Sequence, residues 1–279
     1  MKLIVDSGST KSDLVWLDGR DIVERKQIDG INPFYQTEEE IEASLGSSCS
    51  SPLKECTTEV YFYGAGCVPA KCGIVKEAIK QVFVNAKVEV ESDLLGAARA
   101  LLQHSSGIAC ILGTGSNSCF FDGEKIIKNV PSLGFILGDE GSGANIGKHL
   151  IADILKEYAP QEIRDRFFIE EGVTVAEIMD HVYKQPFPNR YLAQFTKHVF
   201  QHKREDFFRD LLHDCFSQFF ERNILPYESY LKGQRTLHCI GSIAWYFREE
   251  IQTVAEGYGF SLNVLQAPMQ GLIQYHSEG

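Results

Sequence analysis

Hydrophobic and polar positions alternate in short blocks over the first thirty residues, and these blocks predict three strands. The apolar runs lie at residues 3–5, 12–17 and 22–28. The segment Asp-Ser-Gly-Ser-Thr separates the first two runs, and Asp18-Gly19, between the second and third, is typical of a hairpin turn. We therefore expect a three-stranded meander whose first turn is rich in small hydroxyl residues.

The spacing of apolar residues further along the chain predicts helices and strands in alternation. In the first half we expect helices at residues 38–45, 73–83 and 94–103, strands at 60–63 and 88–90, and a loop at 47–52. In the second half we expect strands at residues 108–112, 119–121, 125–128 and 236–240, with helices dominating from 141 onward. An apolar strand followed by a turn of small residues occurs twice, which indicates a duplicated α/β architecture. The predicted division lies near residues 105–107, giving domains of residues 1–106 and 107–279.

Composition and charge narrow the class of protein. The 279 residues are 44% hydrophobic and 23% charged, which is typical of one or two globular domains. A net charge of −11 argues against nucleic acid or an anionic membrane surface as a partner, because the mean field would repel it. A phosphate ligand would therefore need local donors, such as backbone N–H groups or a metal ion.

Localisation follows from what the sequence lacks. No apolar run reaches the roughly 18 residues of a membrane-spanning helix, and Asp6 comes too early for a signal peptide. The eight cysteines are scattered and form no C-x-x-C pair. We expect a cytoplasmic protein with reduced thiols.

Glycine-rich and serine-rich turns are the candidate anion-binding sites of the sequence. Such turns can point several N–H groups and hydroxyls at an anion when they follow a strand. The longest fits neither a P-loop, because Ser142 and His149 occupy required positions, nor a dinucleotide fingerprint, because Ile146 replaces its third glycine. The three turns are D-S-G-S-T-K at residues 6–11, G-T-G-S at 113–116 and G-F-I-L-G-D-E-G-S-G-A-N-I-G at 134–147.

The motifs D-S-G-S-T-K, G-T-G-S-N and L-G-D-E-G-S-G, in this order, resemble those of the acetate-and-sugar-kinase/heat-shock-chaperone/actin superfamily. Within it, the chain is similar to the BadF/BadG/BcrA/BcrD ATPase family and its N-acetylglucosamine kinases, from Asp6 to the helix after Pro268. The resemblance implies two ribonuclease-H-like (actin-like ATPase) domains with an interdomain cleft, the last helix being able to pack back on the first domain. It also implies ATP-dependent phosphorylation of a hydroxyl of an N-acetyl amino sugar, most simply N-acetylglucosamine, with ATP and Mg²⁺, and it allows a homodimer.

The resemblance further implies a role for each matching residue. Asp6 would bind Mg²⁺ through water. Asp93 would be the catalytic base and would bind the sugar together with Asn32 and Asp139. The ATP-binding residues would be Ser9, Thr10, Lys11, Gly113, Thr114, Gly115, Gly241 and Ser242, the last two forming the adenosine-binding turn.

Each sugar-site residue also has a plain structural reading. Asp93 stands where a helix N-cap is expected, Asn32 precedes a proline as a turn initiator would, and Asp139 could be a turn carboxylate. Animal N-acetylglucosamine kinases carry Gly-Trp where this chain has Ser132-Leu133. The sugar therefore stays open among N-acetylglucosamine, N-acetylmannosamine, N-acetylmuramic acid and glucosamine.

Two other functions compete with the amino-sugar kinase. One is an ATPase activator of a reductase or dehydratase that holds an iron–sulfur cluster. Those activators carry Gly-Gly-Gln-Asp where this chain has Gly-Asp-Glu-Gly, and the cysteines here lack cluster spacing. The other is a non-catalytic sugar sensor, against which the presence of both Asp6 and Asp93 argues.

Two residue pairs could bind a metal. His198 and His202 are four apart on an expected helix, but with Lys203-Arg204 adjacent and no third ligand evident we expect a solvated helix face. Cys67 and Cys72 flank a short segment for which a metal or redox role is the less favoured interpretation.

Overall fold

The computed structural model describes residues 1–8, 10–231, 233 and 235–277. The chain forms two compact units, each built around a five-stranded mixed sheet. Unit 1 comprises Met1–Ser105, Gly123–Lys125 and Ala267–Gly279, and unit 2 comprises Ser106–Asp122 and Ile126–Gln266.

In unit 1 the strand order is β3-β2-β1-β4-β5. The strands are β1 (Lys2–Ser7), β2 (Lys11–Asp18), β3 (Asp21–Asp29), β4 (Glu59–Gly64) and β5 (Lys87–Ser92). The helices are α1 (Glu38–Ser48), α2 (Ser51–Cys56), α3 (Cys72–Val82), α4 (Asp93–Leu102) and α14 (Met269–Ser277). β1, β2 and β3 pair antiparallel, which confirms the predicted meander, whereas β4 and β5 extend the sheet parallel to β1.

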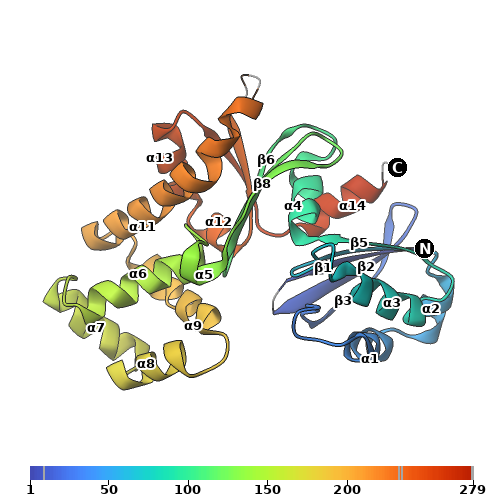
Figure 1. Cartoon of the computed structure of the whole chain (residues 1–279), viewed down its shortest axis with the longest axis horizontal. Helices are drawn as coiled ribbons and strands as arrows, with labels where there is room; N and C mark the ends of the chain where they lie inside the picture. The colour runs from blue at the N-terminus through green and yellow to red at the C-terminus, as the bar shows by residue number, and fades with distance from the viewer. Residues whose placement is uncertain (9, 232, 234, 278–279) are drawn as a thin grey trace. The chain divides into compact units, whose positions relative to one another are not determined.

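Alternation along β1 sends side chains to both faces of this sheet. Leu3 and Val5 join the buried cluster under α1 and α3, while Ile4 joins Leu272 of α14 in the cluster on the other face. Figure 1 shows α4 beside α14. The two helices approach so closely that a Cβ on Gly271 would overlap the carbonyl oxygen of Ala100. The sheet is therefore covered on both faces, and the carboxyl ends of β1, β4 and β5 meet at one edge.

The loop expected at residues 47–52 is partly wrong, because α2 begins at Ser51. Pro52 lies in the first turn of this helix, where its missing N–H has no intrahelical partner to lose. A serine-rich segment with a proline resembles a turn, and only the structure separates the two.

In unit 2 the strand order is β8-β7-β6-β9-β10, the same arrangement as in unit 1. The strands are β6 (Gly107–Leu112), β7 (Ser116–Phe121), β8 (Ile126–Val130), β9 (Thr236–Ile240) and β10 (Ser261–Leu265). The α-helices are α5 (Gly134–Leu137), α6 (Gly143–Leu155), α7 (Gln161–Glu171), α8 (Val175–Tyr183), α9 (Pro188–Gln194), α10 (Thr196–His202), α11 (Asp206–Phe219), α12 (Ser242–Tyr246) and α13 (Arg248–Gly257). A π-helix, η1 (Phe220–Ile224), and a 3₁₀-helix, η2 (Leu225–Tyr230), follow α11. The repeated order confirms the predicted duplicated α/β, actin-like ATPase fold.

The core of unit 2 joins its sheet to its helices. Ile108, Cys110 and Leu112 of β6 point into a cluster of buried apolar side chains that includes Ile146 of α6 and Phe216 of α11. No helix among the described residues has both the length and the apolar composition needed to cross a membrane.

Candidate functional site

Carboxylates gather where β1 ends. Asp6 is the register partner of Asp13 across the β1–β2 pair. Burial, followed by the negative charges of Asp13 and Asp93, raises the pKa of Asp6 to about 7. Lys11 offsets little of this, because its side chain is 61% exposed and its ammonium lies 3.4 Å from Asp13 Oδ2. Three carboxylates in one place favour a bound proton or a divalent cation.

Asp93 is the first residue of α4. The N-cap is Ser92, whose hydroxyl accepts a hydrogen bond from Leu95 N at 3.2 Å, so the interpretation of Asp93 as the cap is wrong. Asp93 Oδ1 accepts a hydrogen bond from Leu94 N at 2.8 Å. Burial raises the pKa of the Asp93 carboxyl, against the opposing effect of that hydrogen bond. The carboxyl is therefore held at a strand-to-helix junction and is more basic than an exposed aspartate.

Asn32 lies beside the loop after β4. Its Oδ1 accepts a hydrogen bond from Phe34 N at 3.0 Å, and a Cβ on Gly66 would collide with the same oxygen. Ile31 N donates to Ser7 Oγ at 2.9 Å, which ties this segment to the end of β1. The predicted turn role of Asn32 is thus present, and its side chain stands next to the carboxyl ends of β1 and β4.

Gly8, Thr10 and Lys11 of the first turn are exposed. Thr10 O accepts a hydrogen bond from Gly30 N at 3.1 Å, and Gly8 N donates to Lys11 O at 2.9 Å. These bonds hold the turn against the meander. The predicted ligand Ser9 lies outside the described residues.

The second turn is hydrogen-bonded to the start of α6 in unit 2. Gly113 N donates to Gly115 O at 2.9 Å, which closes the turn around Thr114. The carbonyl oxygens of Gly113 and Thr114 accept hydrogen bonds from Gly143 N and Ala144 N at 2.8 and 3.0 Å. First-turn N–H groups of a helix lack intrahelical partners, so these two bonds fix the turn on the helix end.

Asp139 lies against the second turn. It is buried, its backbone has a left-handed φ of 54°, and its Oδ1 accepts a hydrogen bond from Ser116 N at 3.3 Å. A Cβ on Gly115 would lie 3.0 Å from Asp139 Oδ2. Burial raises the pKa of Asp139 to about 6, and the nearby Glu140 contributes to this rise. A glycine at 115 thus makes room for the carboxylate.

Gly241 brings the end of β9 close to the same turn. Its φ of 115° is strained for any residue with a side chain, and a Cβ here would overlap the carbonyl oxygen of Leu112. Ser242, the next residue, is exposed at the start of α12. In unit 2 the structure therefore brings together the second turn, Asp139 and the Gly241-Ser242 turn.

The predicted residues divide into one group in each unit. Asp6, Thr10, Lys11, Asn32 and Asp93 belong to unit 1, and the others that the structure describes belong to unit 2. Sequence reasoning missed Asp13, which the hairpin register places opposite Asp6. The signal was available, because strands on both sides of a short turn fix which residues pair.

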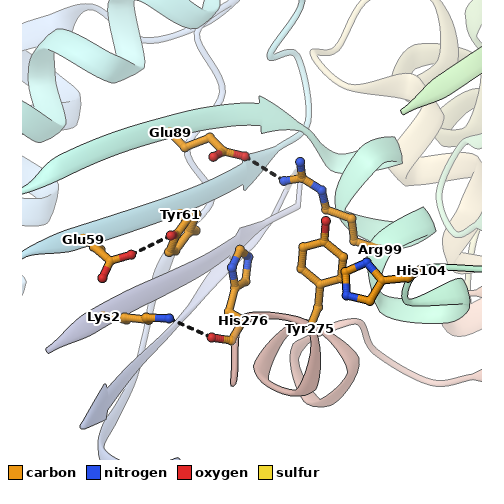
Figure 2. Close-up of a pocket in the computed structure, with 8 residues that line it drawn as sticks. All are labelled: Lys2, Glu59, Tyr61, Glu89, Arg99, His104, Tyr275 and His276. Carbon is orange, nitrogen blue, oxygen red and sulfur yellow. Dashed lines mark hydrogen bonds and ion pairs between the residues drawn. The ribbon is translucent and has the colours of Figure 1, made fainter. Parts of the chain in front are cut away.

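Unit 1 also contains a pocket of about 430 Å³ with none of the predicted residues. Figure 2 shows Tyr61, His276 and Tyr275 in its wall and an ion pair between Glu89 and Arg99 at 2.7 Å. The His276 ring stacks on Tyr61 with centroids 3.9 Å apart, and its Nε2 makes a 2.8 Å hydrogen bond with the hydroxyl of Tyr63. The side chains that line the pocket contact one another, and these contacts attach α14 to the sheet.

Burial of His276 predicts acid sensitivity of unit 1. Burial, and then the positive charges of Arg99 and Lys2, lower the pKa of His276 to about 3, below the ordinary value of 6.5. The stability that the neutral ring contributes is complete above pH 6.5 and is lost as pH falls toward 3. When the pH falls from 7 to 4, the unfolding free energy of wild type should decrease. We expect the decrease for H276Q to be about 2 kcal/mol smaller.

Urea unfolding at both pH values measures this difference. In a Trp245→Phe background, the remaining tryptophan, the buried Trp16, reports on unit 1 alone. H104Q, which alters another histidine of the pocket, serves as the control. An equal loss of stability in wild type and H276Q would contradict the assignment.

Comparison with known proteins finds a solved structure that is similar to the chain in both sequence and fold. A solved structure from Porphyromonas gingivalis, provisionally assigned as an N-acetylglucosamine kinase, shares 45% identity with the chain, with a TM-score of 0.94. The alignment covers 100% of this chain and 99% of that one. The similarity therefore extends over both units and all of the motif turns.

More distant structures share the fold alone. A Chromobacterium violaceum protein, also provisionally assigned as an N-acetylglucosamine kinase, is 14% identical with a TM-score of 0.76, and the alignment covers 98% of each chain. A Listeria monocytogenes protein, provisionally assigned as an N-acetylmannosamine kinase, is 14% identical with a TM-score of 0.55, over 99% of this chain and 97% of that one. No family model matches the chain, and no curated protein matches its sequence.

Proposed function

Because the chain belongs to the N-acetylglucosamine kinase-like family of actin-like ATPases, we propose that it transfers the γ-phosphoryl group of ATP to a hydroxyl of an N-acetyl amino sugar, with N-acetylglucosamine as the expected substrate. The observation that carries the proposal is the 45% identity along the entire chain. The geometry within each unit supports it, since the motif turns lie at strand ends, where phosphate and sugar ligands bind in α/β folds.

The donor set of unit 1 fits a magnesium ion. Asp6, Asp13 and Asp93 are oxygen ligands of the kind Mg²⁺ prefers. Burial, followed by the negative charges of Asp13 and Asp93, raises the pKa of Asp6 to about 7. Asp6, at the end of β1, would hold the ion through water. When bound, Mg²⁺ neutralises negative charge on the ATP phosphates.

In unit 2 the backbone supplies the nucleotide contacts. Gly113, Thr114 and Gly115 form the turn that would meet the phosphates, and the absence of bulky side chains allows close approach. Gly241 and Ser242 would contact adenosine at the start of α12. An acidic protein can bind the ATP phosphates in this way, because backbone N–H dipoles rather than a basic surface would face the anion.

Asp93 would act as the general base. As the sugar oxygen attacks the γ-phosphorus, its proton passes to the Asp93 carboxylate, the bond from the γ-phosphorus to the bridging oxygen breaks, and ADP leaves. The raised pKa of Asp93 makes it a better proton acceptor than an exposed aspartate. Asn32 and Asp139 would position the sugar hydroxyls.

A panel of sugars tests the proposal. The purified protein is mixed with Mg·ATP and N-acetylglucosamine, N-acetylmannosamine, N-acetylmuramic acid, glucosamine or glucose, and ADP release is followed. We expect kcat/KM for N-acetylglucosamine to exceed that for glucosamine by about tenfold or more, because the site would contact the acetyl group. NMR of the product identifies the phosphorylated hydroxyl. ADP release unaffected by every N-acyl sugar would refute the proposal.

A further inference from the structure

Three metal-ligating side chains meet in unit 2, away from the motif turns. Glu170 of α7 and His198 and His202 of α10 place one ligand atom each within 4.8 Å of one another. The expected solvated face is wrong for His198, whose side chain is 0% exposed, and His202 is only 17% exposed. The third ligand, which the sequence did not reveal, is Glu170 of α7, 28 residues before His198 in the chain.

The distances suit a small tetrahedral ion. Glu170 Oε2 lies 3.3 Å from His198 Nδ1 and 2.8 Å from His202 Nε2. Bonds of the length that zinc makes to nitrogen and oxygen set tetrahedral ligand atoms about 3.3 Å apart. His198 and His202 are four residues apart on one helix, so both rings leave α10 on the same side. Little rearrangement would be needed to receive an ion.

His198 is a buried polar group without a hydrogen bond. Neither of its ring nitrogens makes one with any part of the chain that the structure describes. A polar group in this state is costly to folding unless a ligand pairs it.

The surroundings favour a cation. Glu171 Oε1 lies 3.3 Å from His198 Nδ1, and Glu205 Oε1 lies 3.2 Å from His202 Nδ1. Arg166 neutralises part of this charge by donating two hydrogen bonds to Glu205, at 2.7 and 2.8 Å. The positive charge of Lys197 likewise offsets part of the charge of Glu171. Three glutamates against these two cations still leave an excess of negative charge next to the histidines. Glu205 also holds the second nitrogen of His202, as carboxylates do behind metal-bound histidines.

Aromatic rings complete the shell. The ring of Phe167 lies edge-on to His198 with centroids 5.2 Å apart, and Phe208 stacks on His202 at 5.7 Å. Apolar packing of this kind limits water and fixes the imidazole orientation.

We propose that Glu170 Oε2, His198 Nδ1 and His202 Nε2 bind a Zn²⁺ ion, with Glu171 or a water as the fourth ligand, and that the ion joins α7 to α10. Two nitrogen donors favour zinc over magnesium. The site is structural and separate from the phosphotransfer machinery, so it stands whether or not the proposed kinase activity does.

Metal titration tests the site directly. Tag-free protein is stripped with a chelator and titrated with Zn²⁺ against a chromophoric competitor, and separately with Co²⁺. We expect one equivalent of Zn²⁺ to bind, visible d–d bands of four-coordinate cobalt, and a rise in Tm of about 5 °C at saturating zinc. Failure of the wild-type protein to bind zinc at micromolar concentrations would overturn the proposal.

Variants identify the ligands. H202Q and E170Q remove partly exposed side chains and are expected to weaken zinc binding by about 100-fold or more and to abolish the zinc-dependent rise in Tm. H213Q removes an exposed histidine of α11 and should bind zinc as wild type does. Circular dichroism reports whether each variant folds. Zinc affinity unchanged in both H202Q and E170Q would place the ion elsewhere and overturn the assignment.

Discussion

Replacing Asp93 with asparagine is expected to lower kcat by about 1000-fold while the affinity for the sugar changes little. An amide keeps the hydrogen bond from Leu94 N but cannot accept the proton of the attacking hydroxyl. Ser92 remains as the N-cap of α4, so the helix should keep its stability. A loss confined to kcat would mark a group that acts in the transition state.

Two measurements separate the effects on binding and on chemistry. ADP release gives kcat, and calorimetric titration with the sugar in the absence of ATP gives its Kd. D206N is the matched control, because Asp206 is also the first residue of a helix but is exposed. If D93N turned over at the wild-type rate, Asp93 would have no part in the reaction.

Replacing Asp6 with asparagine is expected to move stability and activity in opposite directions. The folded carboxyl has a pKa near 7, above the ordinary 3.8. A raised carboxyl pKa means that wild type loses stability as pH rises from 3.8 through 7. The ligand-free D6N protein should therefore be more stable than wild type by about 2 kcal/mol at pH 8, allowing for solvent screening, and no more stable near pH 4.

Turnover by D6N should fall by about 100-fold or more, because the carboxylate that would hold Mg²⁺ is gone. Thermal unfolding from pH 4 to pH 8, together with the ADP assay, measures both effects. D18N, at the exposed far end of β2, is the control for a lost surface charge. A lower Tm for D6N at pH 8, or an undiminished kcat, would contradict the role given to Asp6.

The meander and the duplicated sheet could be predicted from the sequence because strand alternation and turn residues are local signals. The three runs before residue 30 became β1, β2 and β3, and the repeated strand-and-turn pattern became two sheets of the same order. Helix α2 could not be recognised, because Ser51-Pro52 favours a turn and a helix start alike. Local preference alone does not separate these outcomes.

The candidate site was predictable where its residues lie in motifs and not where packing brings them together. The turns at Asp6 and Gly113 are visible as sequence motifs. The burial of His198 is not, because it depends on α7, whose position relative to α10 is set by tertiary packing rather than by the sequence near either helix. The N-cap of α4 was not predictable either. The helix begins at Asp93, so Ser92 rather than Asp93 is the cap, a difference of one residue.

The shared strand order of the two units gives equivalent positions at their first hairpins, and different residues occupy them. The second residue pair from the turn is Asp6 with Asp13 in unit 1, but Ile111 with Asn117 in unit 2. The same location in the fold thus occurs twice, and acidic side chains occupy it only in unit 1. Aspartates introduced at positions 111 and 117 would place a second carboxylate pair at the matching end of β6.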